Sequence, residues 1–120
     1  MMTVSCSVCV QASSIPSVLS GKDVVIAAET GSGKTYSYLL PLIDKLRGTE
    51  EHSLDVVSDK EVSPPVRRVL LVLCPNVQLC EQVVRMANSL RGDNDETIVS
   101  AAAICGKQVV RCFAFLSLIS

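Results

Sequence analysis

The residues whose types and spacing indicate chemistry most directly lie between Ala28 and Thr35, in the order Ala-Glu-Thr-Gly-Ser-Gly-Lys-Thr. Gly31 and Gly33 allow backbone conformations that are closed to other residues, so consecutive N–H groups can point towards one bound anion. Lys34 adds a compact positive charge, and the hydroxyl of Thr35 is an oxygen ligand of the kind that Mg²⁺ prefers. The segment therefore predicts a loop that binds the phosphates of a nucleoside triphosphate.

This segment has the form of a Walker A loop, with alanine in place of the usual first glycine. Lys34 and Thr35 are the candidate catalytic residues, because the lysine would contact the β- and γ-phosphates and the threonine would hold the Mg²⁺ ion. The alternative is a glycine-rich surface turn that carries an ordinary lysine and threonine. The residues that we expect to contact the nucleotide are Ala28, Glu29, Thr30, Gly31, Ser32, Gly33, Lys34 and Thr35.

A loop of this kind needs a strand before it and a helix after it. The run from Asp23 to Ala28 is β-branched and lacks polar alternation, which predicts a strand buried on both faces of a parallel sheet. Residues Lys34 to Arg47 carry apolar side chains at helical spacing. Upstream, Val10 to Leu19 also has helical spacing, and Gly21 should end that helix.

The remaining pattern continues the alternation of strands and helices. A second apolar run from Arg68 to Cys74 predicts another buried strand, and Asn76 should cap a helix that extends to about Leu90. Thr97 to Cys105 is a third candidate strand, whereas Gly48 to Pro65 is polar and predicts a surface loop. This order predicts an α/β layer architecture with βαβ crossovers.

Composition sets limits on partners. The 120 residues suit a single domain, and the formal net charge of −1 excludes a broad basic surface for nucleic acid. No apolar stretch is long enough for a membrane span, and no basic residue precedes Lys22, so the sequence predicts an intracellular protein without a clear targeting peptide. Among the six cysteines, the pair Cys6 and Cys9 is only a weak metal signal, because no second pair or histidine cluster completes a site.

The loop and its surroundings together resemble the DEAD-box RNA helicases. Ala28 to Thr35 resembles the first ATPase motif of that family, and the stretch from Gln11 to Asp23 resembles its Q motif region. The resemblance implies that the Gln11 amide reads the adenine edge of ATP, since an amide offers one donor and one acceptor group. The alternative for Gln11 is an exposed polar residue of a helix.

A second motif of the family follows the second predicted strand. Residues Pro75 to Gln82 resemble the RNA-contacting motif, which implies RNA contacts at Pro75, Asn76 and Gln78. Val77 stands where the motif has arginine, so RNA binding is expected to be weak or absent in this chain. The sequence is most similar to plant organellar members of the family, which favours a chloroplast as its compartment.

The resemblance implies an incomplete RecA-like P-loop NTPase domain over residues 1–106, with a mainly parallel sheet flanked by helices, followed by an atypical apolar tail over residues 107–120. It implies the ATP-binding part of an ATP-dependent RNA helicase, which uses ATP and Mg²⁺. Asp-Glu-Ala-Asp is absent from the sequence, so we expect nucleotide binding without efficient turnover. The family's sheet inserts later strands among these, so apolar edges and faces should be open.

Two alternatives stay open from the sequence. The first is a non-catalytic module that binds a nucleotide or a partner. The second is another P-loop NTPase, such as a small-molecule kinase, in which Arg85 and Arg91 are the only candidate acceptor-site arginines of the second helix region.

Overall fold

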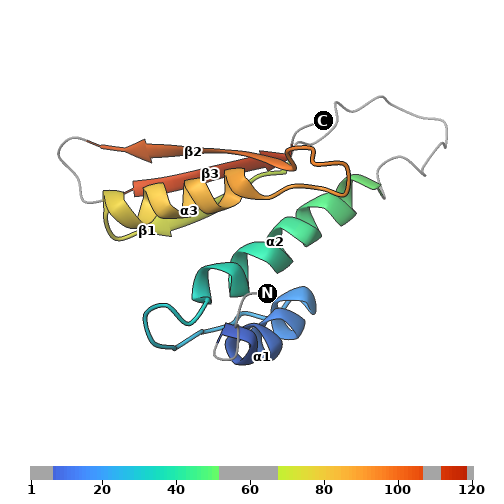
Figure 1. Ribbon diagram of the computed structural model, residues 1–120, viewed down its shortest axis with the longest axis vertical. Coiled ribbons are helices and arrows are strands. Elements are labelled where there is room, and N and C mark those ends of the chain that lie inside the picture. The colour runs from blue at the N-terminus through green and yellow to red at the C-terminus, as the bar shows by residue number, and fades with distance from the viewer. Residues whose placement is uncertain (1–6, 52–67, 107–111, 119–120) are drawn as a thin grey trace. The chain divides into compact units, whose positions relative to one another are not determined.

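The computed structural model describes residues 7–51, 68–106 and 112–118. They form the helices α1 (Ser7–Leu19), α2 (Lys34–Glu51) and α3 (Val77–Ser89) and the strands β1 (Leu70–Cys74), β2 (Val99–Cys105) and β3 (Cys112–Leu118), all labelled in Figure 1. The chain divides into two compact units, Met1–Lys45 and Leu46–Ser120.

The first unit confirms the helix predicted before the glycine-rich loop. Helix α1 begins at Ser7, three residues earlier than the predicted start at Val10. Inside it, the Ser14 hydroxyl donates to the Val10 carbonyl at 2.6 Å, which satisfies a buried polar side chain. The helix ends as predicted, because Gly21 has a φ of 81° and its N–H donates to the Val18 carbonyl.

The strand predicted from Asp23 to Ala28 is wrong in the described structure. Residues 22–29 run between α1 and the loop without pairing to any described strand. Val25 is 96% exposed, whereas a strand buried on both faces would cover it. The apolar run carries the right residue types, but a strand exists only when a neighbouring strand accepts and donates its backbone hydrogen bonds.

The second unit contains a three-stranded sheet with the order β1-β3-β2. Strand β3 is antiparallel to both neighbours, so the mainly parallel sheet predicted from the sequence is wrong for the described strands. Because β1 and β2 each oppose β3, they run in the same direction, and α3 connects them as the predicted βαβ crossover. The parallel pairing is missing because β3 lies between the two strands.

The atypical apolar tail predicted over residues 107–120 includes residues 112–118, which the structure describes. They form the central strand of the sheet, in which Ala114 and Leu116 are fully buried. Strand β3 follows β2 by a short connection, which permits antiparallel pairing without a crossover. The tail therefore supplies the pairing that joins β1 to β2.

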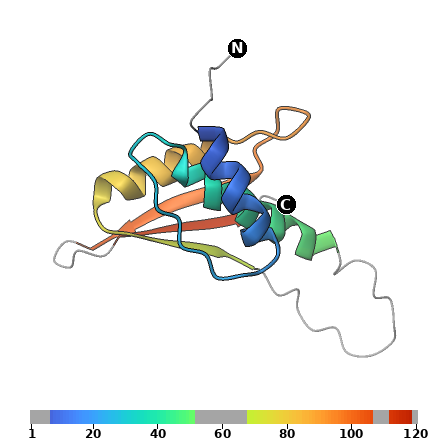
Figure 2. The same cartoon turned by 90° about the horizontal axis from the view of Figure 1, so that it is seen from below.

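Helix α3 lies across one face of this sheet, as Figures 1 and 2 both show. Its buried side chains Cys80, Val83 and Ala87 cover that face. The prediction that an apolar face of the sheet is exposed is confirmed on the opposite side. Large apolar side chains remain exposed there, namely Leu71, Leu73, Ile104 and Phe115.

Two local predictions about helix ends had different outcomes. Asn76 caps α3 as predicted, since its Oδ1 accepts a hydrogen bond from the Leu79 N–H at 2.9 Å. Helix α2 extends to Glu51, so Gly48 begins no loop; the remainder of that predicted loop, residues 52–65, lies outside the described residues. In the part of the chain that the structure describes, no helix has both the length and the apolar character needed to cross a membrane.

Candidate functional site

The glycine-rich loop joins the extended segment to the start of α2. Gly31 and Gly33 have φ values of 80° and 83°, in the region that glycine adopts without strain. A turn precedes Gly33, in which the Ser32 N–H donates to the Glu29 carbonyl at 3.2 Å. A Cβ atom on Gly31 would meet no atom within 4 Å, so the loop faces open space at this point.

The first turn of α2 provides backbone donors next to this open space. The helix begins at Lys34, and the first described backbone bond of the turn runs from the Ser37 N–H to the Gly33 carbonyl at 3.2 Å. The N–H groups of Lys34, Thr35 and Tyr36 have no helical carbonyl to reach. They lie at the positive end of the helix dipole, where an anion is stabilised.

Ser37 fixes this end of the helix and was missed by the sequence reasoning. Its side chain is fully buried, and its hydroxyl donates to the Gly33 carbonyl at 3.0 Å. The same carbonyl thus accepts both the backbone and the side-chain bond, which holds Gly33 in place. A serine four residues after a loop glycine was the only available signal, and it is a weak one.

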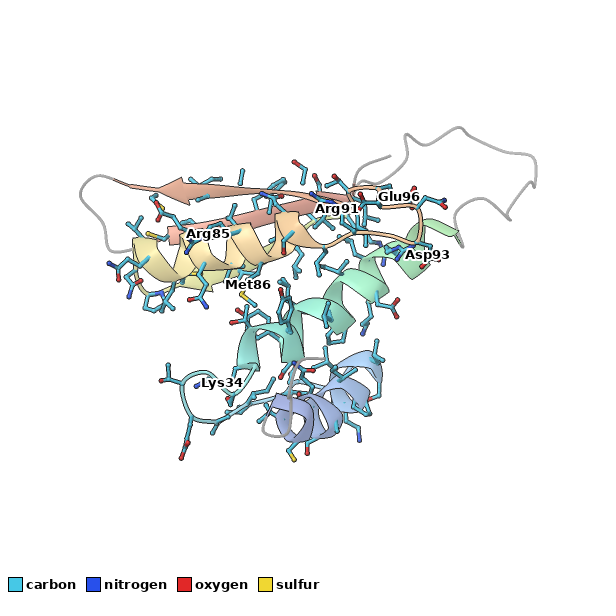
Figure 3. The ribbon with its side chains drawn as sticks, in the orientation of Figure 1. Lys34, Arg85, Met86, Arg91, Asp93 and Glu96 are labelled. Atoms are coloured by element: carbon cyan, nitrogen blue, oxygen red, sulfur yellow. The ribbon has the colours of Figure 1, made fainter. Side chains whose placement is uncertain are left out.

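The polar side chains of the loop include those of Ser32, Lys34 and Thr35. The Lys34 ammonium folds back and donates to the Ala28 carbonyl, at the position where the motif usually has glycine. Figure 3 places Lys34 at the junction of the loop and α2. The Ser32 hydroxyl is buried and has no hydrogen-bond partner among the described residues. Thr35 is half-buried in the first turn of α2.

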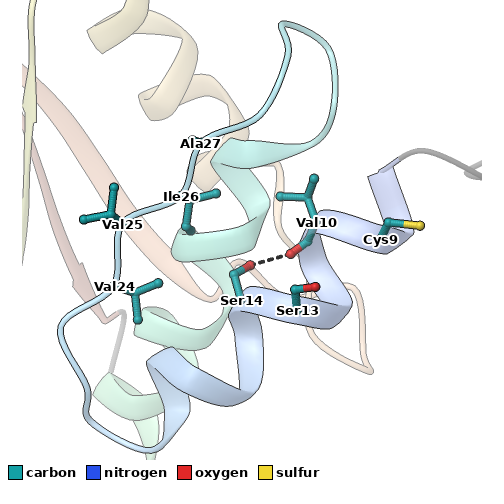
Figure 4. Close-up of a pocket in the computed structure, with 8 residues that line it drawn as sticks. All are labelled: Cys9, Val10, Ser13, Ser14, Val24, Val25, Ile26 and Ala27. Atoms are coloured by element: carbon teal, nitrogen blue, oxygen red, sulfur yellow. Dashed lines mark hydrogen bonds between the residues drawn. The ribbon is translucent and has the colours of Figure 1, made fainter.

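The predicted adenine contact lies elsewhere in the first unit. Gln11 is a half-buried residue of the second turn of α1, separate in sequence from the loop. A pocket of about 390 Å³ opens between α1 and the extended segment (Figure 4). Neither Gln11 nor any loop residue from Glu29 to Thr35 lines it; its lining residues are Cys9, Val10, Ser13, Ser14, Val24, Val25, Ile26 and Ala27.

The residues expected to contact RNA gather at the start of α3, in the second unit. Pro75, Asn76 and Gln78 are all exposed. The Oδ1 atom of Asn76 accepts the hydrogen bond from the Leu79 N–H that caps α3. Val77, which replaces an arginine of the motif, is 46% exposed and brings no charge.

Arg85 and Arg91, the candidate arginines of a kinase acceptor site, both lie in the second unit. The Arg91 guanidinium donates to the carbonyls of Asn88 at 2.7 Å and Leu90 at 3.1 Å, so it closes the C-terminal end of α3. Arg85 is exposed on the outer surface of the same helix (Figure 3). Neither arginine belongs to the unit that contains the glycine-rich loop, so no geometry here favours a kinase.

Comparisons with known proteins show which family the chain resembles. The model of a family described as DEAD/DEAH box helicase matches residues 9–113. DEAD-box ATP-dependent RNA helicase 22 of Arabidopsis thaliana is 52% identical over 98 residues, and the protein of that name from Oryza sativa subsp. japonica is 55% identical over 97 residues. These alignments cover 82% and 81% of the chain but 17% of each relative.

A human protein also matches, the probable ATP-dependent RNA helicase DDX28, which is 51% identical over 81 residues. That alignment covers 68% of the chain and 14% of the human protein. No solved structure matches the chain. The chain therefore spans about one sixth of the length of the curated plant relatives named above.

Proposed function

The chain belongs to the DEAD/DEAH box helicase family, and from this premise we propose that residues Ala28 to Thr35 bind the phosphates of ATP together with Mg²⁺. The observation that carries the proposal is the loop itself. Gly31 and Gly33 have positive φ values, and directly after them come the N–H groups of the first turn of α2, which have no helical carbonyl to reach. An anion is the chemical group that such an arrangement stabilises best.

The described residues fit a bound triphosphate. Gly31 leaves open space beside the loop, and the buried Ser32 hydroxyl has an unused donor. Binding requires Lys34 to exchange the Ala28 carbonyl for a phosphate oxygen, which replaces a neutral acceptor by a charged one. Thr35 supplies the hydroxyl that would hold Mg²⁺, which neutralises phosphate charge when bound. Glu29 and Thr30 complete the loop through their backbone.

We assign the adenine contact to Gln11. Its support is positional, because Gln11 is half-buried on α1 in the same unit as the loop. The amide can pair with the donor and acceptor atoms on one edge of adenine, which guanine presents differently. The predicted consequence is a preference for ATP over GTP that depends on this one side chain.

At the level of the whole protein, we propose the ATP-binding part of an ATP-dependent RNA helicase, in which the described residues form part of a RecA-like domain. Pro75, Asn76 and Gln78 would contact RNA weakly, through the exposed N-terminal turn of α3 and without the arginine that Val77 replaces. The 120 residues should bind nucleotide without efficient turnover, because phosphoryl transfer needs further groups that position water and stabilise charge. A chloroplast is the proposed compartment.

Equilibrium titration with a fluorescent ATP analogue and Mg²⁺ tests the binding proposal. Lys34→Ala should weaken binding about 10- to 100-fold, since a charge-assisted hydrogen bond contributes roughly 1.5–3 kcal/mol. Lys22→Ala removes an exposed lysine of the same unit and is the matched control. Equal affinities of the two variants would contradict the assignment of the phosphate site.

Two further measurements separate the parts of the proposal. Competition by ATP and GTP should show that Gln11→Ala loses the preference for ATP while it keeps binding through the phosphates. RNA-stimulated ATP hydrolysis should be no faster for the chain than for Lys34→Ala. A clearly higher rate in the unsubstituted chain would show that these residues alone support turnover.

A further inference from the structure

Four cysteine side chains gather at one end of the sheet in the second unit. Cys74 ends β1, Cys105 ends β2 and Cys112 begins β3. The strand register places Cys112 directly opposite Cys74 on one side and Cys105 on the other. Directly opposed residues project to the same face of a sheet, so the three thiols form one row across the strands.

Helix α3 adds the fourth thiol above this row. Cys80 is fully buried, and this burial, with the neighbouring thiols of Cys74 and Cys105, raises the pKa of its own thiol. The thiol of Cys105 also raises the pKa of Cys112, which lies directly opposite it. Of the four, Cys105 alone is exposed, while Cys74, Cys80 and Cys112 are buried. The cluster therefore has one thiol that a solute reaches directly.

We propose that Cys105 and Cys112 are an oxidisable thiol pair that peroxide converts into a disulfide. In the first step the Cys105 sulfur attacks hydrogen peroxide, the O–O bond breaks, and a sulfenic acid and one water form. In the second step the Cys112 sulfur attacks the Cys105 sulfur and the S–O bond of the sulfenic acid breaks. The hydroxyl group leaves with the proton of the Cys112 thiol as a second water. Two electrons pass from the thiols to one peroxide.

The backbone geometry suits this bond without rearrangement. Opposed Cα atoms of antiparallel strands are about 4.5–5.5 Å apart, which lies inside the range of about 4.4–6.8 Å that disulfides span. Cys74 is equally well placed relative to Cys112, but it is buried and so reacts with a solute after Cys105. The pair Cys105 and Cys112 also flanks the connection between β2 and β3, where a bridge closes a short loop.

The consequence is a covalent tie that holds the central strand in the sheet. Strand β3 joins β1 and β2, so its loss would separate the two. A bridge at the first residue of β3 restricts the unfolded chain. Oxidation of the chain should therefore raise its Tm, by roughly 10 °C for a chain of this size.

Peptide mapping of the full chain after treatment with one equivalent of hydrogen peroxide tests the proposal. Trypsin cuts after Lys107 and Arg111 and thus separates Cys105 from Cys112, so peptides 92–107 and 112–120 stay joined only through the disulfide. We expect this joined pair, the loss of two free thiols and the increase in Tm, all reversed by dithiothreitol.

Two cysteine variants separate the loss of the disulfide from a general loss of the fold. Cys105→Ser changes an exposed side chain and should abolish the joined peptides and the shift in Tm. Cys9→Ser removes another exposed thiol and should leave both unchanged. A bridge that maps to Cys9, a bridge between two chains, or terminal oxidation of Cys105 alone would overturn the proposal.

A metal ion is the competing occupant of such a cluster. Among the residues that the structure describes, no group of cysteine, histidine or acidic side chains is arranged to hold one. The reduced chain dialysed against zinc should therefore retain none. Retention of one Zn²⁺ per chain, lost in both Cys105→Ser and Cys112→Ser, would assign the cluster to metal binding and overturn the thiol pair.

Discussion

The side chain of Asn88 occupies the outer edge of β2, and its removal should destabilise the second unit. Its Nδ2 donates to the Ala101 carbonyl at 3.1 Å, and its Oδ1 accepts from the Ala101 N–H at 2.9 Å. The amide thus pairs with β2 as a neighbouring strand would, at a place where the edge is otherwise open. Asn88→Ala removes both bonds and leaves both backbone groups of Ala101 without their partner.

The expected magnitude follows from the two bonds. Each neutral hydrogen bond contributes about 0.5–1.5 kcal/mol net, and the groups are only partly buried, so water can replace the lost partner. We therefore expect Asn88→Ala to lower the free energy of unfolding by roughly 1–3 kcal/mol. For a chain of this size that corresponds to a decrease in Tm of about 5–10 °C.

Urea unfolding followed by circular dichroism measures the loss, and hydrogen exchange at the Ala101 amide locates it. Asn94→Ala is the matched control, because Asn94 is exposed in the turn between α3 and β2. The exchange of the Ala101 amide should become faster in Asn88→Ala alone. Equal stability of the two variants, or an unchanged exchange rate at Ala101, would refute the reasoning.

The remaining predictions concern backbone conformation, ionisation and the open face of the sheet. Gly31→Ala should lower stability by about 1–2 kcal/mol because of its positive φ, whereas Gly48→Ala, in helix α2, should raise it by up to about 1 kcal/mol; urea unfolding compares them. Burial raises the pKa of Cys80 from its ordinary value of 9.0 to about 12. The stability that the neutral Cys80 thiol contributes is therefore complete below pH 9 and is lost as the pH rises towards 12. Urea titrations at rising pH should show that loss, and Cys80→Ala should show less of it. Leu73→Lys should reduce aggregation in light scattering without lowering Tm, because Leu73 is 68% exposed; increased aggregation would contradict this.

Features set by neighbouring residues could be predicted from the sequence. The cap at Asn76 and the helix end at Gly21 depend on groups a few residues apart, and both were found as predicted. The positive φ values of Gly31 and Gly33 follow from the motif for the same reason. The glycine-rich loop belongs to this class, because its backbone geometry is local.

Features set by distant residues could not be predicted. The run from Asp23 to Ala28 has the residue types of a strand, but no pattern in it reveals whether a partner strand is present. The pairing of Cys112 with Cys74 and Cys105 depends on a register that residue spacing does not specify. The hydrogen bonds between the Asn88 side chain and the Ala101 backbone join residues 13 positions apart, and no sequence signal marks them.

The pocket beside α1 illustrates the same limit at the candidate site. Its lining comes from α1 and from the extended segment, so it exists only because these two parts lie side by side. Gln11 belongs to the same helix but does not line it. Sequence reasoning could name the residue types that bind a nucleotide, whereas the space around them depends on how the elements pack.

The central claim is that the loop from Ala28 to Thr35 binds the triphosphate of ATP. Nuclear magnetic resonance of the ¹⁵N-labelled chain during titration with ATP and Mg²⁺ tests it most directly. The amide resonances of Gly31, Gly33 and Thr35 should shift in a saturable way, and these shifts should vanish in Lys34→Ala but persist in Lys22→Ala. Saturable shifts confined to other residues, or shifts at the loop that Lys34→Ala leaves unchanged, would contradict the claim.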